Sequence, residues 1–274
     1  SLRSDVYYLV RTSDESTDKI EGSVVWCKWT NHEILVLLIK RILTYFGDSV
    51  DENTLMKTPQ LHLRFHLERV MESTFSGRGK WENVYMYKIL MSLIRKRPRD
   101  LVKLCSLAAQ QAQQTNSPLI KTEHFQAIFE EYSQGRIQDT INEYKSELPN
   151  IENLLFGMRP TKKQRNASDG YIYTTAELIQ KLNNIRQHTN FIFKNGRKAS
   201  ANELAQFLYK INFLTARKIV ESGEIQRKYF EENRYISSSF VDFGYDWEVH
   251  PAFRWVLQPE NINEIFNKLA LSHD

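Results

Sequence analysis

The chain of 274 residues is long enough to form one large domain or two ordinary ones, so it needs no disulfide or metal to hold a core together. Hydrophobic residues make up 41% and charged residues 26%, and the 13 Tyr, 15 Phe and 5 Trp exclude wholesale disorder. A net charge of +4 is too small to require a nucleic acid as partner.

The cysteines do not indicate a disulfide framework. Cys105 lies on an apolar helical stripe and Cys27 is the only other cysteine, which is typical of a protein from a reducing compartment. No apolar run approaches the roughly 20 residues that span a bilayer, and the N-terminal residues lack the pattern of a signal peptide. We therefore expect a cytoplasmic protein that does not contact a membrane.

The first half of the chain predicts mostly helix. Residues 1–30 combine an apolar run with a polar segment and predict extended structure and loop. From Asn31 onward apolar residues recur every three or four positions, with Thr30 as the N-cap and Gly47 as the stop. Further helices are predicted from Trp81 to Leu93, from Pro98 to Ala112, from Thr122 to a stop at Gly135, and from Ile137 to Tyr144. Residues 31–157 are thus expected to form a helical bundle.

Residues 158–170 have no apolar period and contain several turn formers, so they predict a linker and a domain boundary. Helical and alternating patterns then follow in the order of a winged-helix domain, which would cover residues 171–274. Its predicted elements are helices at 176–186 and 202–211, paired strands at 213–219 and 241–249, an enlarged wing at 221–234, and a closing helix from Pro259. The predicted fold class is mainly α: a lid-type bundle, then a winged helix with a small antiparallel β-hairpin.

The run Arg97-Pro98-Arg99-Asp100 opens one of the predicted helices. The free N–H groups and the dipole at a helix N-terminus favour anions, and an arginine adds a forked charged donor. No phosphate-binding motif G-x-x-x-x-G-K-[ST] accompanies it, because Gly79-Lys80 is followed by Trp81. We expect no catalytic residues and no catalysis by this chain alone, and whether the full-length protein is an enzyme stays open at this point.

Several short motifs in a fixed order resemble the C-terminal half of a little-characterised family of bacterial P-loop ATPases related to the AAA+ and STAND classes. They are Arg3-Ser4-Asp5, Trp29-Thr30, Lys40-Arg41-Ile42, Arg97–Leu101, Tyr132-Ser133 and Val249–Arg254. The resemblance spans nearly the whole chain and implies a helical lid followed by a winged helix, similar to the layout of origin-binding initiator ATPases. It also implies an ATPase core before Ser1, with residues 1–30 as its remnant edge and connecting loop.

The resemblance gives Arg99 the role of the sensor 2 arginine, which reaches the terminal phosphates of the nucleotide, with Arg97 as the alternative. A glycine commonly precedes this run in the family, whereas this chain has Lys96. ATP with Mg²⁺ would bind the full-length protein only, and no cofactor or metal is expected in this chain. ATP would then draw the lid towards the core and move the winged helix or release a partner. That partner could be another protein or DNA, and an oligomer is compatible with this reading.

Other interpretations of these residues remain open. Arg95 and its basic neighbours could be a solvated helix junction, with Asp100 compensating the helix dipole. His62 and His66 would share a helix face, but no Glu follows His62 as in H-E-x-x-H, so we expect no metal site. His250 precedes Pro251 without a nucleophile nearby, which favours a structural turn histidine.

The alternative function is a stand-alone DNA-binding regulator that dimerises through its helical unit. Winged helices often place their last helix in the major groove and a basic wing on the DNA backbone. Between residues 202 and 212 the only basic residue is Lys210, so phosphate contacts are expected without base reading. The candidate contacts are Lys194, Arg197, Lys198, Lys210, Arg217, Lys218, Arg227 and Lys228.

Overall fold

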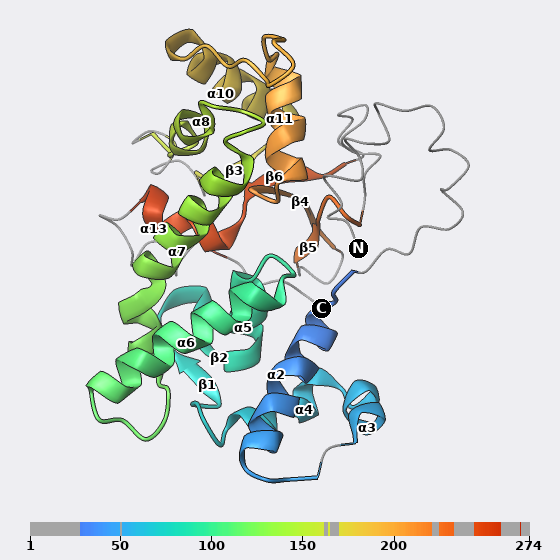
Figure 1. Ribbon diagram of the computed structural model, residues 1–274, viewed down its shortest axis with the longest axis vertical. Helices are drawn as coiled ribbons and strands as arrows, with labels where there is room; N and C mark the ends of the chain where they lie inside the picture. The colour runs from blue at the N-terminus through green and yellow to red at the C-terminus, as the bar shows by residue number, and fades with distance from the viewer. Residues whose placement is uncertain are drawn as a thin grey trace.

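The computed structural model describes residues 28–49, 51–161, 164, 170–220, 225–232, 244–258 and 269, and this part is mainly α-helical with two small antiparallel sheets, as predicted (Figure 1). Its α-helices are α2 (Asn31–Tyr45), α3 (Glu52–Lys57), α4 (Gln60–Leu67), α5 (Met86–Leu93), α6 (Pro98–Gln114), α7 (Thr122–Tyr144), α8 (Ile151–Gly157), α10 (Thr175–His188), α11 (Ala201–Lys210) and α13 (Arg254–Leu257). Its strands are β1 (Thr74–Ser76), β2 (Glu82–Tyr85), β3 (Ile172–Tyr173), β4 (Leu214–Ile219), β5 (Ile225–Lys228) and β6 (Asp246–Val249), and two short 3₁₀ helices are η2 (Gly79–Trp81) and η3 (Pro251–Phe253).

The start of α2 is the one that the sequence predicts. The Thr30 hydroxyl accepts a hydrogen bond from the Glu33 backbone N–H at 3.1 Å, and the Glu33 carboxylate accepts one from the Thr30 backbone N–H at 2.7 Å. This reciprocal capping box satisfies two donors that a helix N-terminus would otherwise leave unpaired. Gly47, with φ +76°, follows the end of the helix as predicted.

The helix predicted from Trp81 is wrong over its first turn. Residues 82–85 form β2, which pairs antiparallel with β1 in the register Phe75 opposite Val84, and α5 begins only at Met86. Asn83 has φ +58°, a left-handed conformation that a right-handed helix cannot include. The apolar spacing is nevertheless satisfied, because Trp81 and Ile89 are both fully buried in the same core.

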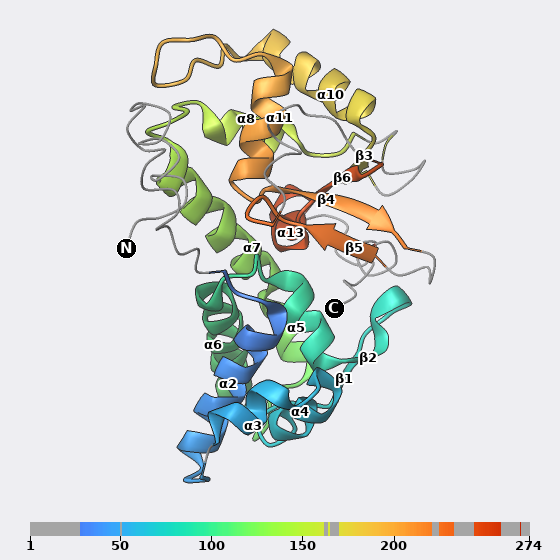
Figure 2. The same ribbon diagram turned by 90° about the vertical axis from the view of Figure 1, so that its right-hand side faces the viewer.

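The stop predicted at Gly135 is also wrong, because α7 runs without a break from Thr122 to Tyr144. A glycine inside a helix costs only about 1 kcal/mol relative to alanine, and packing on both sides of it outweighs that cost. Tyr132 and Ser133 before it, and Arg136 and Ile137 after it, are all buried. Figure 1 and Figure 2 show α7 extending from the lower group of helices into the upper part of the molecule.

The larger sheet has the strand order β3-β6-β4-β5, and all three pairings are antiparallel. The predicted pairing of residues 213–219 with 241–249 is confirmed over the described residues: Leu214 lies opposite Val249, and Ala216 lies opposite Trp247. The segment interpreted as a wing contributes β5, which pairs along the free edge of β4 and extends the sheet. Figure 2 shows α10 and α11 above this sheet.

Two apolar clusters form the core, and α7 contributes to both. The first contains buried side chains between Ile34 and Tyr132 together with Ala252, Trp255 and Leu269, and the second contains other side chains between Ile137 and Leu257. The segment of η3 and α13 also joins them, because Trp255 lies in the first cluster and Phe253 in the second. Along α7 the buried side chains thus belong first to one cluster and then to the other. The domain boundary predicted at 158–170 stays a prediction.

Some predicted features lie outside the described residues. These are the extended segment 1–27, the start of the alternating strand at 241–243, and most of the closing helix that Pro259 would open. Within the described part of the chain, no helix is both long and apolar enough to cross a bilayer.

Candidate functional site

Residues 94–97, which we call the α5–α6 turn, join α5 to α6. The predicted nucleotide-sensing run begins at the last residue of this turn, Arg97, and continues into the first turn of α6. Lys96 adopts φ +51°, in the left-handed region that a glycine occupies without strain. Because lysine carries a Cβ, Lys96 makes the turn at some conformational cost. Arg97 is then the N-cap of α6, and Pro98 is its first residue.

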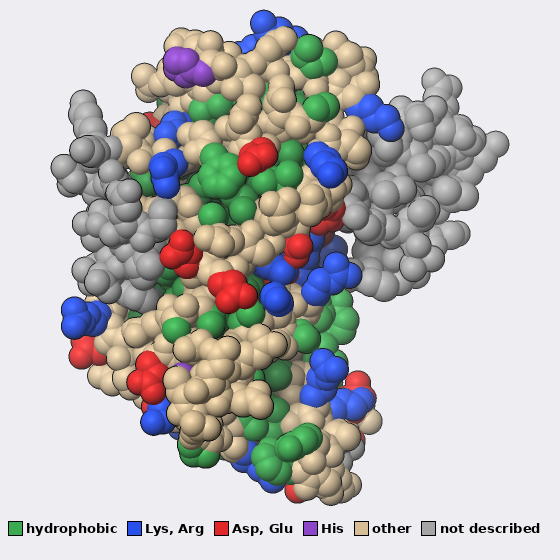
Figure 3. All heavy atoms as spheres, turned by 60° about the vertical axis from the view of Figure 1, so that its left-hand side comes forward, with side chains coloured by type: hydrophobic (Ala, Val, Ile, Leu, Met, Phe, Trp, Pro, Cys, Tyr) green, Lys and Arg blue, Asp and Glu red, His purple; other side chains and the backbone are tan. Residues whose placement is uncertain are grey.

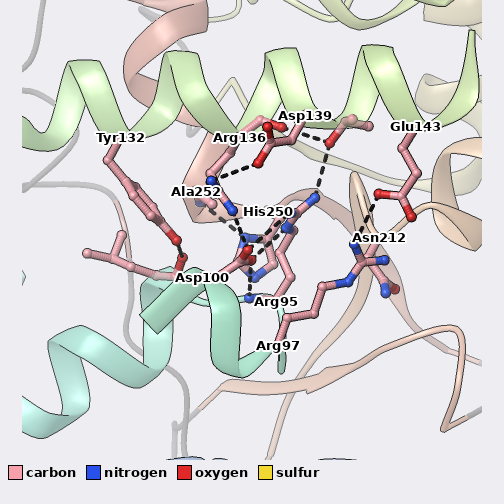
Figure 4. Close-up of polar contacts among 12 residues, drawn as sticks. Arg95, Arg97, Asp100, Tyr132, Arg136, Asp139, Glu143, Asn212, His250 and Ala252 are labelled. Carbon is pink, nitrogen blue, oxygen red and sulfur yellow. Dashed lines mark hydrogen bonds and ion pairs between the residues drawn. The ribbon is translucent and has the colours of Figure 1, made fainter. Parts of the chain in front are cut away.

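The side chain of Asp100 fixes this turn from inside the molecule (Figure 4). Its two carboxylate oxygens accept hydrogen bonds from Arg95 Nε at 2.8 Å and Nη2 at 3.1 Å, and a third comes from the Arg95 backbone N–H at 3.3 Å. Arg136 on α7 donates to the same carboxylate at 2.6 Å. Arg95 also donates to the Thr140 hydroxyl at 3.1 Å. We call these four residues the Asp100 network.

The Asp100 network is closed to solvent. The side chains of Arg95, Asp100 and Arg136 are 3%, 1% and 5% exposed, so the surrounding medium screens their charges little. Burial alone would raise the pKa of Asp100, but the neighbouring Arg95, and then Arg136, hold that pKa well below its usual range. The carboxylate therefore stays ionised, and the idea that Asp100 is a solvated acid that only compensates the helix dipole is wrong.

The two predicted nucleotide-sensing arginines lie in different surroundings. Arg97 is about one-third exposed and pairs with Glu143 on α7 at 3.3 Å, pointing away from Asp100 (Figure 4). Arg99 is exposed in the first turn of α6, and no described residue pairs with it. The structure does not bring these two arginines together. At this helix start, Arg99 is the arginine whose side chain is exposed to solvent.

Lys96 connects the α5–α6 turn to the segment that follows β5. Its ammonium lies 2.6 Å from the Glu232 carboxylate and 5.1 Å from the centre of the Tyr229 ring. Glu232 in turn accepts a hydrogen bond from the Tyr229 backbone N–H at 2.9 Å, and the Tyr229 hydroxyl lies 3.0 Å from His250 Nε2. Sequence reasoning missed these contacts, because the partners are 136 residues apart in the chain.

A second buried carboxylate, Glu248 on β6, lies among three arginines. Arg227 donates to it at 2.6 and 3.0 Å and Arg254 at 2.5 Å, while Arg217 Nε lies 3.9 Å from it. Burial would raise the pKa of Glu248, but Arg227 and then Arg254 lower it to about 2. Arg217 and Arg227, which were predicted to contact phosphate, are therefore directed into the protein interior. Burial of both side chains disfavours that role.

The other predicted phosphate contacts lie at the surface. Lys194, Arg197 and Lys198 are exposed in the loop before α11, where Arg197 pairs with Glu203 at 3.3 Å. Lys218 is exposed on β4 and Lys228 is half-buried on β5, whereas Lys210 pairs with Glu147 at 2.9 Å. Asn202 is the only exposed residue of α11. Their contact with phosphate stays a prediction.

Three described histidines and Cys105 were candidates for metal binding or chemistry. Among the described residues, no group of three or more His, Cys, Asp or Glu side chains could hold a metal ion, and His62 and His66 have no third ligand. Burial raises the pKa of the Cys105 thiol to about 12, which leaves it protonated and unreactive. His250 is fully buried, and its Nδ1 accepts a hydrogen bond from the Ala252 backbone N–H at 3.1 Å, so it caps the η3 turn.

His250 gives a prediction for the dependence of stability on pH. Burial, and then the nearby Arg95 and Arg227, lower its pKa from 6.5 to about 3. Below pH 6.5 the unfolded chain takes up a proton that the folded protein does not, so stability should fall by up to about 1.4 kcal/mol per pH unit. Urea unfolding between pH 6.5 and about 5 measures this slope. His250→Asn keeps a side-chain oxygen to cap Ala252 and should flatten the slope, and an unchanged slope would contradict the assignment.

Comparison with known proteins identifies one region. Residues 60–141, from the start of α4 to near the end of α7, match a family described as the FunZ-associated C-terminal helical domain. The match covers less than half of the chain and includes all of α6, with Arg99, and the whole Asp100 network. Neither the curated proteins nor the solved structures contain a match to the chain.

Proposed function

We propose that this chain couples the nucleotide state of a P-loop ATPase to a protein partner, with Arg99 as the contact to the nucleotide phosphates. The observation that carries the proposal is the environment of the arginines around the α5–α6 turn. Described carboxylates bind Arg95 and Arg97, whereas Arg99 is exposed on the first turn of a 17-residue helix. A phosphate there would meet a forked cation and the free N–H groups of the helix start.

The helical half supports a role as part of a larger protein. The family that matches residues 60–141 is named for a C-terminal helical domain, and the match includes α6 and most of α7. The sequence resemblance to P-loop ATPases implies an ATPase core, which would lie before Ser1 and would hold ATP and Mg²⁺. This chain would act as the lid of that core and would contribute no catalytic residue.

The second half supports the effector role. Its elements run in the order α8, β3, α10, α11, β4, β6, and β6 lies between β3 and β4, which fits a winged helix with β5 added at the edge. The helix that would enter a DNA groove, α11, has Asn202 as its only exposed residue and contacts the end of α7. Phe207 packs on Tyr144 with their ring centres 6.1 Å apart. Because such a helix has little surface left for base contacts, a protein is the better partner.

A surface suited to a protein partner is present on the second half. Figure 3 shows apolar side chains gathered in the upper part of one face, with lysine and arginine side chains beside them. Exposed apolar residues of this half include Phe156, Ile192 and Ile219. Apolar centres with polar rims are typical of protein interfaces. DNA binding would instead appear as strongly salt-dependent affinity of the chain for duplex DNA, lost on combined Lys194→Ala and Lys198→Ala substitution.

The proposal is tested by Arg99→Ala in the full-length protein. Removing a charge-assisted hydrogen bond of about 1.5–3 kcal/mol should weaken ATP affinity or slow hydrolysis by roughly 10- to 150-fold. Lys103→Ala is the matched control, because Lys103 is an exposed cation one turn further along α6. Isothermal titration calorimetry and steady-state hydrolysis provide the measurements. Equal nucleotide affinity and rate in Arg99→Ala and the parent protein would rule out this role for Arg99.

A further inference from the structure

The α5–α6 turn contacts both halves of the molecule through adjacent residues. Arg95 enters the Asp100 network, and its guanidinium also lies 5.4 Å from the ring centre of Phe253 in η3. Lys96 reaches Glu232 and Tyr229 beyond β5, and three residues later Arg99 stands on the first turn of α6. Arg99, proposed to contact the nucleotide, and Lys96, which contacts the segment after β5, therefore belong to one short stretch of backbone.

The Asp100 carboxylate makes that stretch rigid. It accepts hydrogen bonds from the backbone N–H and the guanidinium of Arg95 while it sits itself in the first turn of α6. The start of α6 therefore cannot rotate without moving Arg95, or else breaking a buried ion pair. Lys96 lies between these two anchored points in its left-handed conformation, so its ammonium follows any movement of the helix start.

On the other side, the segment that Lys96 contacts forms and follows the edge strand of the larger sheet. β5 is the edge strand and pairs only with β4 among the described strands. The residues after it are held by Glu232, which accepts from Tyr229 N, and by Asn212, whose amide donates to Glu231 at 3.0 and 3.1 Å. Edge strands and short turns are the parts of a fold that open at lowest free energy.

We infer that the α5–α6 turn transmits the nucleotide state sensed at Arg99 to residues 225–232, through the ion pair of Lys96 with Glu232. This inference rests on the proposed function, because it names how the site around Arg99 is linked to the effector half. A phosphate that shifts the start of α6 would move Lys96 relative to Glu232 and change how firmly the sheet edge is held. The partner would then meet a sheet edge whose opening depends on nucleotide.

Hydrogen exchange of the full-length protein, read by mass spectrometry, tests the inference. Lys96→Gly is the informative variant, because glycine keeps the left-handed turn without strain and lacks the ammonium. Glu232→Gln removes the other charge of the same pair. Lys228→Met is the matched control, because it removes a cation from β5 that makes no described contact with the α5–α6 turn.

Without nucleotide, Lys96→Gly and Glu232→Gln should each raise exchange in residues 225–232 by roughly two- to fivefold, the range of a partly exposed ion pair, and leave α6 unchanged. A non-hydrolysable ATP analogue should alter exchange of this segment in the parent protein and in Lys228→Met, but not in the other two variants. Because coupling between two sites is reciprocal, their affinity for the analogue should differ from that of the parent by no more than roughly the same two- to fivefold.

The contrary outcomes separate the two claims. If Lys96→Gly binds the analogue normally and its segment 225–232 still responds, the coupling through Lys96 is wrong while the role of Arg99 stands. The same holds if the segment of the parent protein does not respond to bound analogue. If Arg99→Ala leaves the affinity for the analogue unchanged, the proposed function fails, and the inference fails with it.

Discussion

Replacing Asp100 by Asn is expected to lower the free energy of unfolding by about 3–5 kcal/mol. The side chain keeps its size, so the loss comes from charge alone: Arg95 and Arg136 would remain buried without their shared carboxylate. Desolvated guanidinium groups are costly unless they are paired, and Arg136 would keep only Asp139, at 2.8 Å. Urea or guanidinium unfolding followed by circular dichroism gives the midpoint and the slope.

Asp139→Asn is the matched control for this variant. Asp139 also pairs with Arg136, but its side chain is 52% exposed, so its removal should cost less than about 1 kcal/mol. The unfolding slope should be the same in both variants if each unfolds from the same native state. A loss below about 1 kcal/mol in Asp100→Asn would show that the carboxylate does not hold the α5–α6 turn.

Replacing Trp255 by Ala is expected to cost about 3–5 kcal/mol and to loosen the contact between the two apolar clusters. The indole is fully buried, with its ring centre 4.7 Å from that of Phe129 and 6.0 Å from that of Trp81. Its neighbours belong to the helical half, whereas its own helix, α13, follows the last described strand of the sheet. The substitution would therefore leave a cavity where the C-terminal segment contacts the helical half.

Unfolding followed by tryptophan fluorescence and by far-ultraviolet circular dichroism tests this second prediction. If Trp255 joins the clusters, the two probes should give different midpoints in the variant, because the clusters would no longer unfold together. Trp29→Ala is the matched control, since Trp29 is 44% exposed and precedes α2, and its loss should be within about 0.5 kcal/mol. A Trp255→Ala protein as stable as the parent would refute the role of this side chain.

The features that the sequence predicts correctly are those fixed by nearby residues. Thr30 and Glu33 are three positions apart, so the start of α2 depends on a contact within one helical turn. The strand ending at Val249 alternates apolar and charged residues, and its partner at Leu214 has the complementary apolar face. Pro98 similarly marks the first residue of α6 because it lacks the N–H that this position does not use.

The features that the sequence does not reveal depend on distant residues. From its neighbours in the sequence, Gly135 is expected to end a helix. The helix α7 continues because Ser133 and Arg136 on either side of Gly135 are buried against other elements. Asp100 looks like an ordinary first-turn acid, because its second arginine lies 36 residues away on α7. The turn at Lys96 is similar: a lysine in a left-handed conformation is visible only in the backbone, and its Glu232 partner belongs to the other half.

The indole of Trp81 donates a hydrogen bond to the backbone carbonyl of Leu269 at 2.9 Å, across 188 residues of chain. Both residues are fully buried in the first apolar cluster, together with Trp255 and Ala252. The helical half therefore cannot complete its core while the ribosome is still adding the second half. At 5–20 residues per second the Trp81 surface stays open for roughly 10–40 s. A translational pause in that interval would prolong the exposure of this apolar surface.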